Sequence, residues 1–114
     1  MVLEWDVLMT ENRFKACEWI LSQVDFSFID AIRVQDPGAF EYAKSLCQKY
    51  PHLRIQCILE TGHHNLPAIL GWIENAPEVI ERVILSIEIP KKRLLEILPK
   101  IPVETELLGL GRIL

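Results

Sequence analysis

The sequence lacks the long apolar run that a membrane-spanning helix needs, since no stretch approaches about 18 apolar residues. It opens Met-Val-Leu-Glu-Trp-Asp, without the basic and apolar regions of a secretory signal peptide. The three cysteines, Cys17, Cys47 and Cys57, show no C-x-x-C spacing, and such an odd set is typical of reduced thiols. We therefore expect a cytoplasmic protein without a membrane partner, whose cysteines act as small buried apolar residues.

Basic charge is also scarce in this chain. Lys and Arg number 12 against 16 Asp and Glu, which gives a net charge of -4. This balance argues against strong direct binding to nucleic acid, which needs a positive surface. The sequence also has no G-x-S-x-G elbow, no Gly-rich phosphate loop and no Cys–His nucleophile pair. Residue chemistry alone therefore names no reaction.

Five short apolar segments alternate with helical patterns along the 114 residues. The segments are 3–9, 31–34, 55–59, 83–87 and 103–108, and the helical patterns are 11–23, 36–49, 65–73 and 90–98. Repeated βα units joined by right-handed crossovers form a parallel sheet. A complete eight-unit barrel needs about 250 residues. The predicted fold is therefore one α/β domain over 1–114, with about five strands and four helices, that resembles a partial TIM-type barrel.

Helical spacing predicts which side chains enter the core. In the first helix the apolar side is formed by Phe14, Cys17, Ile20, Leu21 and Val24, and in the fourth by Leu94, Leu95 and Leu98. The three tryptophans, Trp5, Trp19 and Trp72, lie in apolar patterns, so we expect core positions for them. The basic run 91–93 is expected to face water, because the helix dipole disfavours positive charge in a first turn.

Polar residues alternate with apolar ones in the predicted strands, although Ile58 and Ile84 also fall at positions of the polar parity. Successive strand side chains point to opposite faces, so one face packs on the helices and the other is polar. The polar face collects Glu4, Asp6, Arg33, Gln35, Gln56, Glu60, Ser86, Glu88, Glu104 and Glu106. Six carboxylates against one arginine need water, raised pKa values or added cations. Two interpretations stay open, a solvated open half-sheet and an active-site lumen in which Arg33 anchors charge.

The densest chemical cluster is 60–65, Glu-Thr-Gly-His-His-Asn, between a strand and a helix, where α/β proteins bind ligands. Glu60 with His63 or His64 suits a general base and acid. We assign no metal, because adjacent histidines on an extended loop diverge. The alternative is a plain turn with solvated histidines. Arg33, Asp36 and Glu88 are the candidate substrate-binding residues, although Asp36 also suits a helix cap.

Three segments resemble one family. They are 3–6 (Leu-Glu-Trp-Asp), 30–38 (Asp-Ala-Ile-Arg-Val-Gln-Asp-Pro-Gly) and 103–109 (Val-Glu-Thr-Glu-Leu-Leu-Gly). They are similar to the middle of the catalytic domain of the collagenase-like peptidases, peptidase family U32. The resemblance covers nearly the whole chain and implies a TIM-type barrel in a bacterial cytoplasmic protein. Some members are proteases, and others act in prephenate-dependent RNA hydroxylation or in ubiquinone hydroxylation with an iron–sulfur cluster.

The chain departs from the family pattern after the fifth strand. Relatives commonly carry His-Gly and then a cysteine there, whereas 108–112 reads Leu-Gly-Leu-Gly-Arg. We therefore expect no cofactor in this fragment, although some related full-length proteins hold an iron–sulfur cluster. The resemblance implies a protease fragment, inactive alone, whose substrate is a peptide or RNA of unknown identity. The alternatives are an RNA- or ubiquinone-hydroxylation factor and a non-catalytic module that forms a homodimer through open sheet edges.

Overall fold

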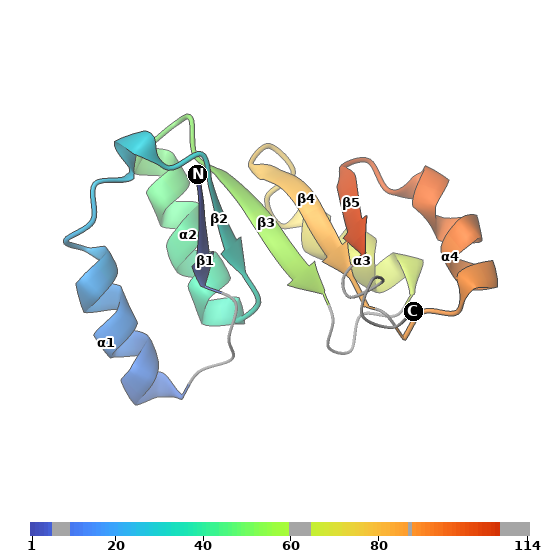
Figure 1. Cartoon of the computed structure of the whole chain (residues 1–114), viewed down its shortest axis with the longest axis horizontal. Coiled ribbons are helices and arrows are strands. Elements are labelled where there is room, and N and C mark those ends of the chain that lie inside the picture. Colours follow the sequence, from blue (N-terminus) through green and yellow to red (C-terminus); the bar gives the residue numbers. More distant parts are fainter. Residues whose placement is uncertain (6–9, 60–64, 87, 108–114) are drawn as a thin grey trace.

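The computed structural model describes residues 1–5, 10–59, 65–86 and 88–107. Strands and helices alternate along them in the order β1 (Val2–Trp5), α1 (Glu11–Leu21), β2 (Ala31–Val34), α2 (Pro37–Lys49), β3 (Arg54–Leu59), α3 (Leu66–Glu74), β4 (Ile80–Leu85), α4 (Lys91–Ile97) and β5 (Glu104–Leu107). Two short 3-10 helices, η1 (Phe26–Phe28) and η2 (Leu98–Lys100), precede β2 and β5. Neighbouring strands pair in parallel in the order β1-β2-β3-β4-β5 (Figure 1). The predicted α/β fold is confirmed.

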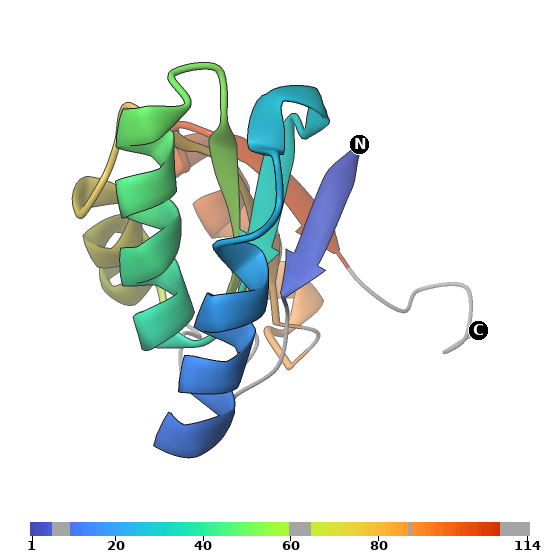
Figure 2. The same ribbon diagram turned by 90° about the vertical axis from the view of Figure 1, so that its left-hand side faces the viewer.

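One apolar core lies between the sheet and the helices. The strands contribute alternate residues such as Ile32, Val34 and Ile55, and α2 contributes Phe40 and Ala43. Figure 2 shows α1 and α2 on the same side of the sheet. The strand residues of the other parity therefore project from the opposite face. Within the described ranges, no helix combines the length and the apolar character that crossing a membrane requires.

Three helices, α1, α2 and α3, begin where the sequence predicts, because side-chain oxygens cap their first turns. Thr10 accepts a hydrogen bond from the backbone N–H of Arg13 at 3.4 Å, and Asn65 accepts one from Ala68 at 2.9 Å. These oxygens satisfy backbone donors that have no partner within the helix. A proline in the first turn of α2 and of α3 adds a backbone angle that already suits a helix.

Three predicted core positions are wrong. Trp19 and Ile20 on α1 and Leu95 on α4 are exposed, whereas Ile97 is the buried residue of α4. Helical spacing identifies an apolar side but not how much of it neighbouring elements cover, and α1 and α4 are the outermost helices of the layer (Figure 1). Trp5, by contrast, is buried as predicted.

The fourth strand begins earlier than predicted, at Ile80 instead of Val83. Its register with β3 shifts between Ile55 and Gln56, so that Ile55 pairs with Ile80 while Gln56 pairs with Arg82. Glu81 is therefore the extra residue of a β-bulge. This irregularity interrupts the alternation between Ile80 and Arg82, and the earlier start of the strand adds Arg82 to the polar face.

Candidate functional site

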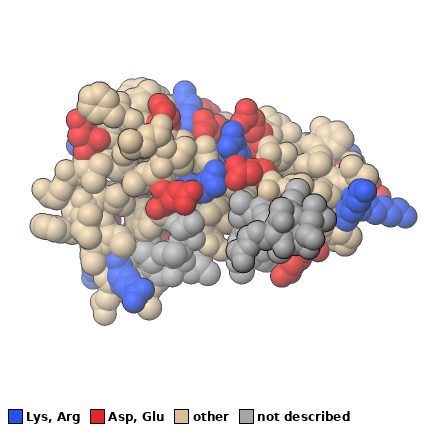
Figure 3. Space-filling model, viewed as in Figure 1, with Lys and Arg blue, Asp and Glu red and all other residues tan. Residues whose placement is uncertain are grey.

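One residue from each strand forms a line across the polar face. The strand register aligns Glu4 with Arg33, Arg33 with Gln56, Gln56 with Arg82 and Arg82 with Glu104. We call these five residues the polar row. Glutamates stand at its two ends and arginines stand on either side of the central glutamine. Figure 3 shows acidic and basic side chains gathered over this face, as the strand alternation predicts.

Gln56 is the buried centre of the polar row, with only 3% of its surface exposed. Its Oε1 atom accepts hydrogen bonds from Nε and Nη2 of Arg33 at 3.0 and 2.8 Å. Its Nε2 atom donates to Oε2 of Glu81 at 2.7 Å. Glu81, the extra residue of the bulge, thus supplies the acceptor for the buried side-chain amide of Gln56. An unpaired buried amide would be costly in free energy.

Arg33 also reaches across the sheet to Glu106 on β5. Its Nη1 and Nη2 atoms donate to the two carboxylate oxygens of Glu106, each at 3.2 Å. Two strands, β3 and β4, separate β2 from β5, and in a flat sheet β2 and β5 would lie about 14 Å apart. The contact therefore brings two long side chains together over the intervening strands, in agreement with a sheet that curls around the polar face. That face is concave, as in part of a barrel.

Arg82 is the second cation of the concave face. It donates to Oε2 of Glu104 at 3.2 and 2.7 Å and to Oε1 of Glu106 at 3.1 Å. Hydrogen bonding to Glu104 raises the pKa of Arg82 above its ordinary value. Glu106 thus accepts from both arginines and links them.

The described residues of this network leave an excess of negative charge. Glu4, Glu81, Glu104 and Glu106 give four carboxylates, while Arg33 and Arg82 give two cations, so the balance is 2 - 4 = -2. Both arginines already bond to carboxylates, so an incoming anion would have to compete with Glu106. A ligand with a positive group suits this face better.

The predicted site residues fall in different places. Glu60, His63 and His64 lie outside the described residues, as do Asp6 and the proposed turn at Gly62.

Asp36 and Glu88 follow β2 and β4 at the carboxyl end of the sheet. Asp36 caps α2, because its Oδ2 atom accepts from the backbone N–H of Ala39 at 3.1 Å. Glu88 is exposed, and its backbone N–H donates to Oγ of Ser86 at 3.1 Å. Arg33 lies within its strand and bonds toward β5. Contact of Arg33, Asp36 and Glu88 with substrate stays a prediction.

The buried thiols are poor candidates for chemistry. Burial raises the pKa of Cys57 to about 12 and that of Cys47 to about 11. Both therefore stay protonated near neutral pH, whereas a nucleophile must be a thiolate. Within the ranges the structure describes, no three His, Cys, Asp or Glu side chains are grouped to hold a metal ion.

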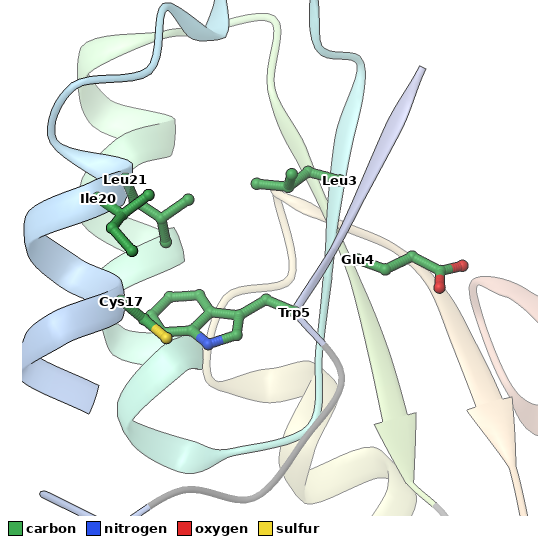
Figure 4. Close-up of a pocket in the computed structure, with 6 residues that line it drawn as sticks. All are labelled: Leu3, Glu4, Trp5, Cys17, Ile20 and Leu21. Carbon is green, nitrogen blue, oxygen red and sulfur yellow. The ribbon is translucent and has the colours of Figure 1, made fainter. Parts of the chain in front are cut away.

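A second recess lies between β1 and α1, on the helix side of the sheet (Figure 4). We call it the β1 groove. Its volume is about 130 Å³, and its lining is mainly apolar. It is lined by Leu3, Glu4, Trp5, Cys17, Ile20 and Leu21. The sequence does not predict this groove, since the apolar pattern of the lining residues other than Glu4 does not show how completely α1 covers β1.

The family model of peptidase family U32 matches residues 1–114, the whole chain. The chain belongs to peptidase family U32. The resemblance drawn from the three sequence segments is therefore confirmed, and the open parallel sheet is compatible with the partial barrel that it implies. No curated protein and no solved structure matches the chain significantly.

Proposed function

We propose that this member of peptidase family U32 binds peptides on the concave polar face and contributes that face to a protease barrel. The observation that carries the proposal is the contact of Arg33 with Glu106, since it agrees with a sheet that curls around a face with excess carboxylates. A peptide offers backbone N–H donors and positive groups at its amino terminus and at lysine or arginine side chains. Both suit exposed carboxylates such as those of Glu4 and Glu104.

The cleavage step is assigned to residues at the carboxyl ends of the strands. Glu60 would take a proton from water as the water oxygen attacks the peptide carbonyl carbon. His63 or His64 would give a proton to the leaving amine as the C–N bond breaks. These roles rest on sequence position and residue type. Five strands form an open sheet, so we expect the chain alone to bind peptides with little or no cleavage.

RNA is the weaker candidate ligand for this face. Its phosphates would meet a described network with a charge of -2, in which both arginines are already bonded. Nucleic-acid binding requires cations that neutralise phosphates. A peptide therefore fits the charge of the face better than RNA does.

Binding of a mixed peptide library tests the proposal, with bound peptides identified by mass spectrometry. We expect Glu104→Gln to weaken binding several-fold, because it removes a carboxylate from the concave face. Glu96→Gln is the matched control, since Glu96 also pairs with an arginine but lies on α4. Equal binding by both variants, or no binding by the unmodified protein, would refute the proposed function. Any hydrolysis should be lost in Glu60→Gln, and hydrolysis that persists would exclude Glu60 as the base.

A further inference from the structure

Glu106 lies between the two arginines of the concave face. Its Oε2 atom accepts a hydrogen bond from Nη1 of Arg33 at 3.2 Å, and its Oε1 atom accepts one from Nη2 of Arg33 at 3.2 Å. The same Oε1 atom also accepts from Nη1 of Arg82 at 3.1 Å. Donors from two guanidinium groups therefore converge on one carboxylate, and the planar fork of arginine is well suited to bind a carboxylate in this way.

Each of the two arginines is also held by a residue other than Glu106. The buried Gln56 accepts from Nε and Nη2 of Arg33 at 3.0 and 2.8 Å. Glu104 accepts from Nε and Nη2 of Arg82 at 3.2 and 2.7 Å. The donors that face Glu106 would therefore stay near their present places without its carboxylate. Together they form a preorganised anion-binding site that an internal carboxylate fills.

We propose that Glu106 is a specificity-determining residue, which excludes carboxylate ligands by occupying an anion-binding site between Arg33 and Arg82. Glu106 is attached to β5, so it fills this site without the translational and rotational entropy that a free ligand loses on binding. A ligand carboxylate would have to displace it and join a described network that already has a charge of -2. Displacement is therefore unfavourable.

The consequence for substrates rests on the proposed function, the binding of peptides to the concave face. Glu106 would let this face accept the basic and uncharged parts of a peptide. It would keep the carboxyl terminus and acidic side chains of the peptide away from Arg33 and Arg82. The ligand class is thus narrowed to peptides that place no carboxylate on the concave face.

Acetate binding to Glu106→Ala tests the anion-binding site without any peptide. Acetate has the carboxylate and the adjoining carbon that this substitution removes, and Glu106 is 28% exposed, so ions can reach its place. Thermal unfolding is measured in rising acetate, with chloride keeping the ionic strength constant. We expect acetate to raise the unfolding temperature of Glu106→Ala in a saturable way and not that of the unmodified protein.

Two controls assign the acetate effect to the pair of arginines. Glu96→Ala frees a single exposed arginine, Arg93, on α4 and should not respond to acetate. Adding Arg33→Met to Glu106→Ala removes the donors of Arg33 and should abolish the response. If Glu106→Ala is unfolded in chloride, recovery of its circular dichroism in acetate is measured instead. No response of Glu106→Ala to acetate, or an equal response of Glu96→Ala, would overturn the proposal.

Titration calorimetry with acetyl-Ala-Lys-Ala tests the specificity, with the peptide either as the free acid or as the amide. The unmodified protein should bind the amide several-fold more tightly, whereas Glu106→Ala should bind the free acid at least as tightly as the amide. Equal binding of the two peptides by the unmodified protein would overturn the role of Glu106. Binding of neither peptide would count against the proposed function, and the acetate experiment would then decide alone on the anion-binding site.

Discussion

Replacing Arg33 by methionine should destabilise the protein far more than the same change at Arg93. The side chain of Arg33 is 15% exposed and donates hydrogen bonds to Gln56 and Glu106. Arg93 is half-exposed and forms an ion pair with Glu96 one turn along α4. Both substitutions keep a long apolar side chain. Their difference therefore reports the network on the concave face.

The magnitude follows from the groups that lose a partner. Arg33→Met removes two donors from Oε1 of buried Gln56, and an unsatisfied buried acceptor costs about 1–3 kcal/mol. The lost bonds to Glu106 add about 1 kcal/mol, because Glu106 is partly solvated and keeps Arg82. We expect a loss of about 2–4 kcal/mol, against total stability on the order of 6–17 kcal/mol for this length. Arg93→Met should cost about 0–0.5 kcal/mol.

Urea unfolding, followed by circular dichroism and by tryptophan fluorescence, measures both losses. The two probes must give coincident transitions for the free energies to be comparable. Similar losses for Arg33→Met and Arg93→Met would mean that Arg33 is solvated. In that case the polar face is a solvated face of an open sheet, and the hydrogen-bond network between Arg33, Gln56 and Glu106 is not formed.

Two further predictions concern the core. Trp5→Ala should lower the unfolding free energy by about 3–5 kcal/mol, because the indole is buried and stacks on Phe14 with the ring centroids 5.6 Å apart. Trp19→Ala should change the unfolding free energy by no more than about 0.5 kcal/mol, since Trp19 is 68% exposed. Thermal unfolding measures both variants, and equal destabilisation by Trp5→Ala and Trp19→Ala would contradict the burial of Trp5. Burial raises the pKa of Cys57 in the folded state to about 12. The stability that the neutral thiol contributes is therefore complete below about pH 8.5, where the thiol is protonated in the folded and the unfolded state. It is lost as the pH rises toward the folded pKa, because the unfolded state then releases its proton first. Between pH 8 and 10.5, urea titrations should show the unmodified protein losing about 2–3 kcal/mol more than Cys57→Ala, and parallel losses would contradict deep burial of the thiol.

Much of the fold follows from local sequence patterns. Alternation of apolar and polar residues predicts the strands and assigns Glu4, Arg33, Gln56 and Glu104 to one face. Asn65 predicts the start of α3, because a capping oxygen satisfies free backbone donors. These features depend on neighbours in sequence, so the sequence is enough to find them.

The missed features depend on contacts distant in sequence. Arg82 escaped the prediction because β4 begins at Ile80 instead of Val83, and Glu81 escaped it because a bulge interrupts the alternation there. The exposure of Trp19 and Leu95 was not predicted, because helical spacing does not show where the layer of helices ends. The contact of Arg33 with a carboxylate 73 positions away depends on the curvature of the whole sheet.

The most direct test of the curled polar face is a double-mutant cycle between Arg33 and Glu106. Unfolding free energies are measured for Arg33→Met, Glu106→Gln and the double variant. Residues on strands three places apart in a flat sheet are too distant to couple, and their effects would add within about 0.3–0.5 kcal/mol. The observed bonds at 3.2 Å predict instead a coupling energy of about 1–2 kcal/mol. Additive effects would contradict the concave face on which the proposed function depends.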